Sequence, residues 1–181
     1  TSSTIHDNTA QSYGGGVNAY QGTMNISGST IYKNTAPNGG GVNAYQGTMN
    51  ITSSTINNNT AQNSGGGVRA SSATVNITSS TIANNEATQN GGGVHNRNST
   101  VNLKSTIIAK NRAGEGVDIH KHNFDTENFQ SQGFNLIGVD DGNAFNAGQN
   151  DKVGTSAHLD PLFVDPDGGD NDPNNDYSLQ E

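Results

Sequence analysis

The stretch GGGVNAYQGTMNITSSTINNNTAQN, residues 39–63, decides the fold, because close copies of it follow one another along the chain. The motif GGGV recurs at spacings of 25, 26 and 26 residues, and a second motif, I-x-x-N, recurs with the same period of 25–26 residues. The GGGV motifs end at Val17, Val42, Val68 and Val94. Self-similarity at such a short, fixed period is the signature of a solenoid, in which each repeat forms one turn and buries its apolar side chains against its neighbours.

Alternation within one repeat predicts strands. Val42, Met49 and Ile56 lie seven residues apart, in short runs where apolar and polar residues alternate. A period of two in runs separated by bends is typical of strands and not of helices. Stacked copies would form three parallel sheets with neighbouring strands about 4.8 Å apart. We therefore predict an all-β fold, a three-sided parallel β-helix of 25–26 residues per turn, with the right-handed crossover that parallel connections strongly favour.

Stacking places equivalent residues of successive turns in columns. We expect one inward column to begin at Val17 and to run through the GGGV motifs to Val117. The Asn residues of the I-x-x-N motifs should form a ladder at a bend, because Asn tolerates left-handed backbone and its amide can bond to its copy in the next turn. The ladder residues are Asn8, Asn34, Asn59, Asn85 and Asn111.

The repeats divide the chain into two parts of one solenoid domain. We expect about five regular turns over residues 1–118, followed by irregular turns with long loops over residues 119–181. Within the second part, residues 119–158 are predicted to be an excursion with one strand, Phe134–Val139. Residues 159–181 are predicted to supply a final irregular turn.

The first repeat is incomplete and is expected to leave a strand edge without a neighbour. The chain opens at Thr1 partway through a repeat, so we expect an excised piece of a longer, exported protein. The strand around Thr4–Asn8 would then present an unpaired edge, and bare edges template pairing with another chain. Head-to-tail stacking is heterologous and builds open fibres. The chain is therefore predicted to be either a fragment with an N-terminal end prone to association or a filament subunit.

Composition excludes several classes of function. Hydrophobic residues make up 29% of the chain and charged residues 13%, too few apolar side chains for a wide core but enough for a narrow tube. The net charge of −8, without a basic cluster, argues against nucleic acid, which needs Lys and Arg on one face. The chain has no cysteine, so disulfides and thiolate zinc sites are excluded. No apolar run approaches the length of a membrane span.

The two repeat motifs are similar to those of a known group of proteins. GGGV followed by I-x-x-N resembles the paired GGA[ILV] and FxxN motifs of bacterial polymorphic outer-membrane and autotransporter adhesins, over residues 1–118. The later segments resemble the C-terminal end of large bacterial surface β-helix proteins with a choice-of-anchor domain. Those segments are residues 107–111, 133–138, 159–163 and 176–179. The resemblance implies an extracellular or cell-surface location.

The leading functional prediction is a non-catalytic one. A stack of regular polar faces can offer many weak contacts to glycans or to surface proteins. We therefore expect a structural or adhesive segment of a bacterial cell-surface or extracellular fibre protein.

An enzyme acting on acidic polysaccharide is the rival prediction. Such sites need acids or a base beside charge-stabilising groups on one face. One outward column gathers such chemistry: Asn18, Asn43, Arg69, His95 and Asp118. Neighbouring members would lie about one strand spacing apart. Arg69, His95 and Asp118 are therefore the candidate catalytic residues, and a bland surface charge pairing is the alternative.

A third prediction is ice binding. A Thr-x-Asn pair recurs on the outward face of successive turns, and flat Thr-rich faces on β-solenoids resemble those of ice-binding proteins. The repeated residues are Thr23, Asn25, Thr48, Asn50, Thr74, Asn76, Thr100 and Asn102. The bulky Tyr20, Tyr32 and Tyr45 interrupt neighbouring columns, and Thr and Asn are also ordinary solvent-facing strand residues.

The acidic C-terminal segment is a candidate calcium site. It places hard oxygen donors at two- and three-residue steps, and calcium takes six to eight such ligands. The proposed ligands are Asp165, Asp167, Asp170, Asp172 and Asp176. The spacing lacks the Gly and terminal Glu of an EF-hand, and a solvated acidic loop is the alternative. Residues 140–143 form a weaker second cluster.

Overall fold

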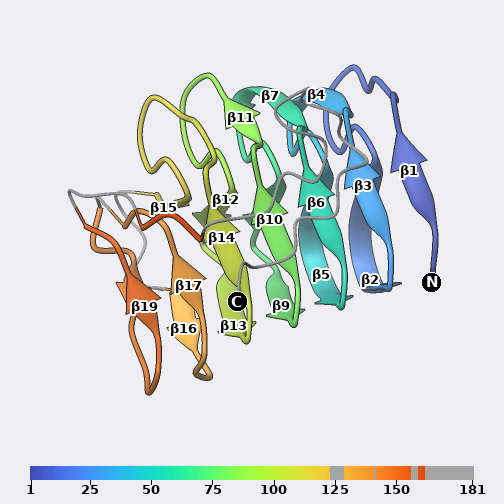
Figure 1. Cartoon of the computed structure of the whole chain (residues 1–181). Coiled ribbons are helices and arrows are strands. Elements are labelled where there is room, and N and C mark those ends of the chain that lie inside the picture. Colours follow the sequence, from blue (N-terminus) through green and yellow to red (C-terminus); the bar gives the residue numbers. More distant parts are fainter. Residues whose placement is uncertain (123–128, 141, 156–158, 162–181) are drawn as a thin grey trace, which may run out of the picture.

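The protein is a β-solenoid whose strands stack along one axis (Figure 1). The computed structural model describes residues 1–122, 129–140, 142–155 and 159–161, and every regular element within these residues is a β-strand. Neighbouring strands pair in parallel, each with the equivalent strand of the next turn. The predicted all-β parallel β-helix is confirmed. The described residues contain no helix long and apolar enough to cross a membrane.

The strands form three sheets. The seven-stranded sheet contains β1 (Thr4–His6), β3 (Thr30–Tyr32), β6 (Thr55–Asn57), β10 (Thr81–Ala83), β14 (Ile107–Ala109), β17 (Leu136–Ile137) and β19 (Lys152–Val153). The nine-stranded sheet contains β2 (Val17–Ser27), β5 (Val42–Thr52), β8 (Val68–Ser71), β9 (Thr74–Thr78), β12 (Val94–Arg97), β13 (Thr100–Lys104), β15 (Ile119–Lys121), β16 (Phe129–Ser131) and β18 (Phe145–Asn146). The three-stranded sheet contains β4 (Thr35–Asn38), β7 (Thr60–Ser64) and β11 (Glu86–Ala87).

The sides of the coil differ from the three that the sequence predicts. β2 and β5 run without a break through the bends at Gln21 and Gln46, whose φ angles are 60° and 52°. Two predicted sides are thereby joined in one sheet. A short additional side, the three-stranded sheet, lies where the sequence predicts only a corner. Ala61, in β7, lies fully buried on this side.

The core is one continuous cluster of inward side chains that stack in several columns inside the coil. Val42, Met49 and Ile56, the three anchors of one repeat, each have 0% of their surface exposed. The register places like on like: Ile5 pairs with Ile31, and the same column continues through later turns to Ile137. Few apolar residues are needed, because each turn contributes only a few side chains to the narrow core and the adjacent turns bury them.

The inward valine column ends differently from the prediction. Val94 pairs with Ile119, and not with Val117. The reason is a backbone hydrogen bond from Gly93 N to Val117 O of 3.2 Å, which places Val117 opposite the last glycine of the preceding GGG corner. The fifth turn therefore begins two residues later than its GEGV sequence suggests.

The stacking continues beyond residue 118. β17 pairs with β14, and β18 pairs with β16, so residues after 119 add further turns instead of an excursion. Phe129 follows Val101 in the same inward column and is fully buried. The predicted strand Phe134–Val139 is observed only at Leu136–Ile137, because Phe134 has a φ of 61° and lies 65% exposed at the bend before it.

The left-handed bend lies one residue before each ladder Asn, and not at the Asn as predicted. Asp7, Lys33 and Asn58 have φ angles of 55°, 52° and 52°. Asn84 and Lys110 repeat this conformation. The bend turns the following Asn side chain inward, where its amide meets the next turn.

Candidate functional site

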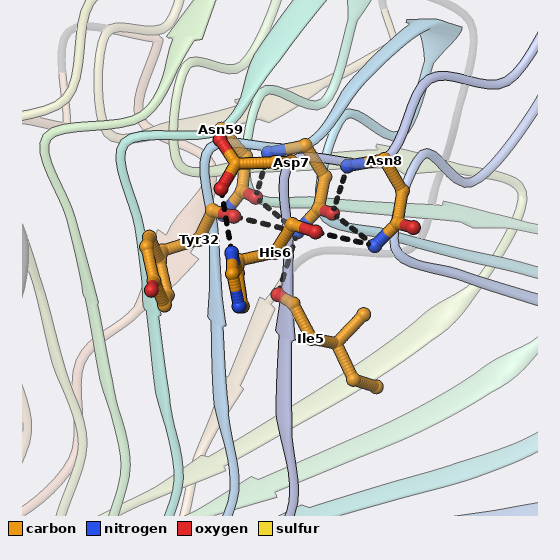
Figure 2. A network of polar contacts seen from close by, with 7 residues as sticks. Ile5, His6, Asp7, Asn8, Tyr32 and Asn59 are labelled. Atoms are coloured by element: carbon orange, nitrogen blue, oxygen red, sulfur yellow. Dashed lines mark hydrogen bonds and ion pairs between the residues drawn. The ribbon is translucent and has the colours of Figure 1, made fainter.

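The Asn ladder is a structural network inside the coil. Asn34 Nδ2 donates to Ile5 O, Tyr32 O and Asn59 Oδ1, each at 3.0 Å, and Asn34 N also donates to Asn59 Oδ1. Figure 2 shows the first members of the network beside the stacked rings of His6 and Tyr32. Asn59, Asn85 and Asn111 repeat the pattern. The predicted ladder is confirmed. Its side-chain amides form hydrogen bonds between adjacent turns, which gives them a structural role.

Asp118 is the last member of this ladder in the described residues. Its Oδ1 accepts hydrogen bonds from Asn111 N at 3.0 Å and from Asn111 Nδ2 at 2.8 Å, and its side chain is fully buried. A carboxylate can take the place of Asn here because the ladder needs an acceptor for two N–H donors. The prediction that Asp118 stacks beside His95 is therefore wrong: the neighbour of His95 is His120.

The outward column that was expected to hold catalytic residues is a chain of stacked polar side chains. It consists of Asn18, Asn43, Arg69, His95 and His120. Asn43 Nδ2 donates to Asn18 Oδ1 at 2.8 Å, and Arg69 Nη1 donates to Asn43 Oδ1 at 3.1 Å. Each first glycine of a GGG corner folds against this column: a Cβ on Gly65 would lie 2.8 Å from the Cβ of Arg69. The column is thus outward-facing and yet largely covered.

His95 is a neutral, enclosed imidazole. Its ring stacks on that of His120 with centroids 5.1 Å apart, and the two Nδ1 atoms lie 3.1 Å apart, which requires one ring to donate and the other to accept. Burial lowers the pKa of His95 to about 3, and the charges of His120 and Arg69 act in the same direction. With 3% of its surface exposed, His95 is poorly placed to exchange protons with a substrate.

A second outward column lies two residues further along the same strands. It consists of Tyr20, Tyr45, Ser71 and Arg97. The rings of Tyr20 and Tyr45 stack with centroids 5.3 Å apart, and Tyr20 is 67% exposed. The column therefore presents two aromatic rings, then a small hydroxyl, then a cation.

The two columns enclose a hollow together with Tyr13, which precedes the first GGG corner. This hollow, called the Tyr–Arg hollow below, has a volume of about 380 Å³. Its lining residues are Tyr13, Asn18, Tyr20, Asn43, Tyr45, Arg69, Ser71 and Arg97. The guanidinium carbon of Arg69 lies 5.4 Å from the ring centroid of Tyr13, and Arg69 is 7% exposed. Burial lowers the pKa of Arg69, although a guanidinium stays charged in proteins.

No protein-family model, curated protein or solved structure matches the chain.

In the sequence, Tyr20 and Tyr45 stand out only as interruptions of a Thr face. The signal that could have found them is the run V-N-A-Y, in which Asn and Tyr two residues apart must share the outward face. Tyr13 had no such signal, because its counterparts at the same corner are Asn38 and Ser64.

The predicted Thr-x-Asn face is in register across four turns. Thr48 pairs with Thr23 and Thr74, and Asn50 pairs with Asn25 and Asn76. Thr100 and Asn102 extend both rows. The Asn side chains form an outer ladder in which each Nδ2 donates to the Oδ1 of the preceding turn at 2.8 Å.

The proposed calcium ligands at residues 165–176 lie outside the described residues. Within the described part of the chain, no group of three or more His, Cys, Asp or Glu side chains is placed to hold a metal ion. Asp140, from the weaker acidic cluster, accepts hydrogen bonds from Ala144 N at 2.7 Å and Phe145 N at 3.0 Å, and so fixes the loop before β18.

Proposed function

We propose that this chain is a non-catalytic structural and adhesive segment of a bacterial cell-surface or extracellular fibre protein, and that the Tyr–Arg hollow is its contact surface for glycans. The observation that supports it best is the hollow itself. Exposed aromatic rings and polar side chains are gathered there on a rigid solenoid wall, and concave sites with a few convergent polar groups are the usual form of ligand sites.

The structural half of the proposal rests on the two Asn ladders. The inner ladder ties each turn to the next through buried amides, and the outer ladder repeats the connection on the Thr-x-Asn face. A stack tied in this way can separate its ends by a fixed distance, as a stalk requires. The surface location rests on the resemblance of the GGGV and I-x-x-N motifs to those of bacterial adhesins.

The positions of the three candidate catalytic residues support the non-catalytic proposal. Of the three candidate catalytic residues, Arg69 and His95 lie on neighbouring strands, but Asp118 belongs to the inner ladder. His95 is enclosed and hydrogen-bonded to His120. The set that an acid–base mechanism would require is therefore not assembled on this face.

The test compares binding with turnover on the same polysaccharides. We expect the purified chain to adhere to glycan-coated surfaces without releasing shortened or unsaturated products from pectate, alginate or glycosaminoglycans. Turnover that is lost in His95→Asn, a variant that restores the residue type of Asn43 in the same column, would contradict the proposal.

Ice binding is a second candidate, favoured by the in-register Thr rows. Thr23, Thr48, Thr74 and Thr100 repeat at the strand spacing of about 4.8 Å on one sheet. We expect an ice-binding face to give thermal hysteresis that Thr48→Tyr abolishes. Hysteresis that is absent, or unchanged in this variant, would exclude the candidate.

Self-association would act at the first turn. β1 and β2 each pair with one neighbour within the described residues, and Val17 and Met24 there are only partly buried. A second copy stacking head to tail would cover them, and we propose this mode of association for the fibre. Electron microscopy over a concentration series should show filaments, whereas uniform monomers at high concentration would contradict it.

Calcium binding by the Asp-rich segment is a further proposal. We expect calorimetric titration to show binding that a chelator removes. Asp167→Ala combined with Asp170→Ala should abolish any gain in thermal stability from calcium. An unchanged gain would place the calcium elsewhere.

A further inference from the structure

We propose that the Tyr–Arg hollow binds an anionic saccharide, whose ring packs on the tyrosines and whose carboxylate or sulfate meets Arg69 and Arg97. This inference rests on the proposed adhesive function and names its ligand class. The first ground for it is enrichment: two of the three arginines and three of the five tyrosines of the chain line this one hollow. In a chain with a net charge of −8, such a concentration marks a site and not an average surface.

The second ground is the buried charge of Arg69. Its side chain is 7% exposed, and its contacts among the described residues are to neutral groups, the amide of Asn43 and the ring of Tyr13. A buried cation is costly unless an anion compensates for it. A guanidinium has five N–H donors in a fork that matches carboxylate and sulfate-like oxygens, and Asn43 occupies one of them. The hollow gives an anion access to the rest.

The third ground is the order of residues along the outer column. Tyr45 and Arg97 are separated by Ser71 and stand two strands apart, which is about 10 Å at the strand spacing. A ring resting on Tyr45 therefore brings its substituents over Ser71, between the buried Arg69 and the exposed Arg97. The hollow thus has an aromatic half and a cationic half that one charged sugar unit can span.

The chemistry of the lining favours a saccharide. The face of a tyrosine ring carries negative potential, and the C–H hydrogens of a sugar ring are weakly positive. Asn18, Asn43 and Ser71 supply amide and hydroxyl groups that suit sugar hydroxyls. A single-stranded nucleic acid also stacks on aromatic rings, but it needs a basic groove along its backbone, and among the lining residues Arg69 and Arg97 are the cations.

The experiment measures binding of the whole chain to immobilised polygalacturonate, heparin and dextran, which carry carboxylate, sulfate and no charge. Arg97→Gln removes the exposed cation, and Arg112→Gln is the matched control, because Arg112 is an exposed arginine outside the hollow. We expect at least one of the anionic polymers to bind, with affinity reduced about tenfold or more in Arg97→Gln. Arg97→Lys should recover part of the loss, and Tyr45→Ala should also weaken binding.

The outcomes separate this inference from the proposed function. Binding to polygalacturonate alone identifies a carboxylate, and binding to heparin alone a sulfate; either supports the inference. Preference for dextran, equal losses in Arg97→Gln and Arg112→Gln, or stronger binding to a single-stranded oligonucleotide would overturn it. The absence of binding to all three polymers also overturns it. In each of these cases, adhesion of the chain to cell surfaces still decides the adhesive function separately.

Discussion

The second and third turns of the solenoid both have a fully buried apolar interior, but their outward side chains differ. The inward pairs are Val42 and Val68, Met49 and Val75, and Ile51 and Ile77, and all six side chains have 0% of their surface exposed. At the outward positions between them, Asn43 faces Arg69, and Tyr45 faces Ser71. The backbone register is continuous through both turns.

This difference shows which residues determine the fold and which are free to acquire a function. An inward residue must fit a narrow column between two neighbours, so its size and polarity are fixed by stacking. An outward residue needs only to tolerate a strand and the side chain above it. The Tyr–Arg hollow lies where two turns with outward tyrosines meet two turns with outward arginines. The inward side chains remain apolar and buried across this change.

The largest effect is expected for an inner ladder residue. Asn59 Nδ2 donates to Ile31 O and to Asn85 Oδ1 at 2.9 Å, and its Oδ1 accepts from Asn34 N and Nδ2. Asn59→Ala leaves several buried groups without partners, so we expect a loss of about 4 kcal/mol in the free energy of unfolding. Asn50→Ala, in the outer ladder, should cost about 1 kcal/mol. Urea titration measures both, and equal losses would show that the two ladders are equivalent.

An inward apolar residue should come next. Met49→Ala opens a cavity in a fully buried site, so we expect a loss of about 3 kcal/mol in the free energy of unfolding. Thr48→Ala, its outward neighbour, should change stability by less than about 1 kcal/mol. If the outward change proved as costly as the inward one, the division between core and surface would fail.

Acidification should destabilise the fourth turn through His95. The unfolded chain takes up a proton near pH 6.5, whereas folded His95 stays neutral down to about pH 3. Between these values the unfolded state binds more protons, so the free energy of unfolding falls as the pH falls. The decrease in the free energy of unfolding should reach about 2 kcal/mol at pH 5. His95→Asn should flatten the melting temperature between pH 7 and pH 5, and a slope equal to that of the parent chain would assign the effect to other groups.

A small effect on stability is also expected for an outward aromatic residue. Tyr20 is 67% exposed and stacks on Tyr45. Tyr20→Ser should therefore cost only about 1 kcal/mol, the worth of one aromatic pair, while glycan binding weakens. Thermal unfolding and binding measured on the same sample separate the two effects. A large loss of stability would mean that the outer column supports the core.

The sequence predicts the solenoid well because its period is local: seven-residue steps place Val42, Met49 and Ile56 in the core, and I-x-x-N places the ladder. It fails where position depends on contacts between turns. The GEGV sequence ending at Val117 resembles a GGGV corner, and only the hydrogen bond from Gly93 to Val117 shows that the next strand begins at Ile119. That shift of two residues exchanges His120 for Asp118 beside His95.

The hollow escaped prediction for a related reason. Tyr13, Tyr45 and Arg97 come from different turns, and no single repeat contains both the aromatic and the cationic half. The repeat makes recurring residues such as the GGGV and I-x-x-N motifs conspicuous. The tyrosines and arginines that line the hollow do not recur in every turn, so the repeat does not reveal them.

The most direct test converts the outward residues of the third turn into those of the second. The double variant Arg69→Asn with Ser71→Tyr keeps every inward residue and extends both the amide and the tyrosine columns of the first two turns. We expect its free energy of unfolding to stay within about 2 kcal/mol of the parent chain, and its affinity for the preferred anionic polysaccharide to fall about tenfold or more. A folded variant that binds as tightly as the parent, or a variant that does not fold, would contradict the claim that inward residues set the fold and outward residues the function.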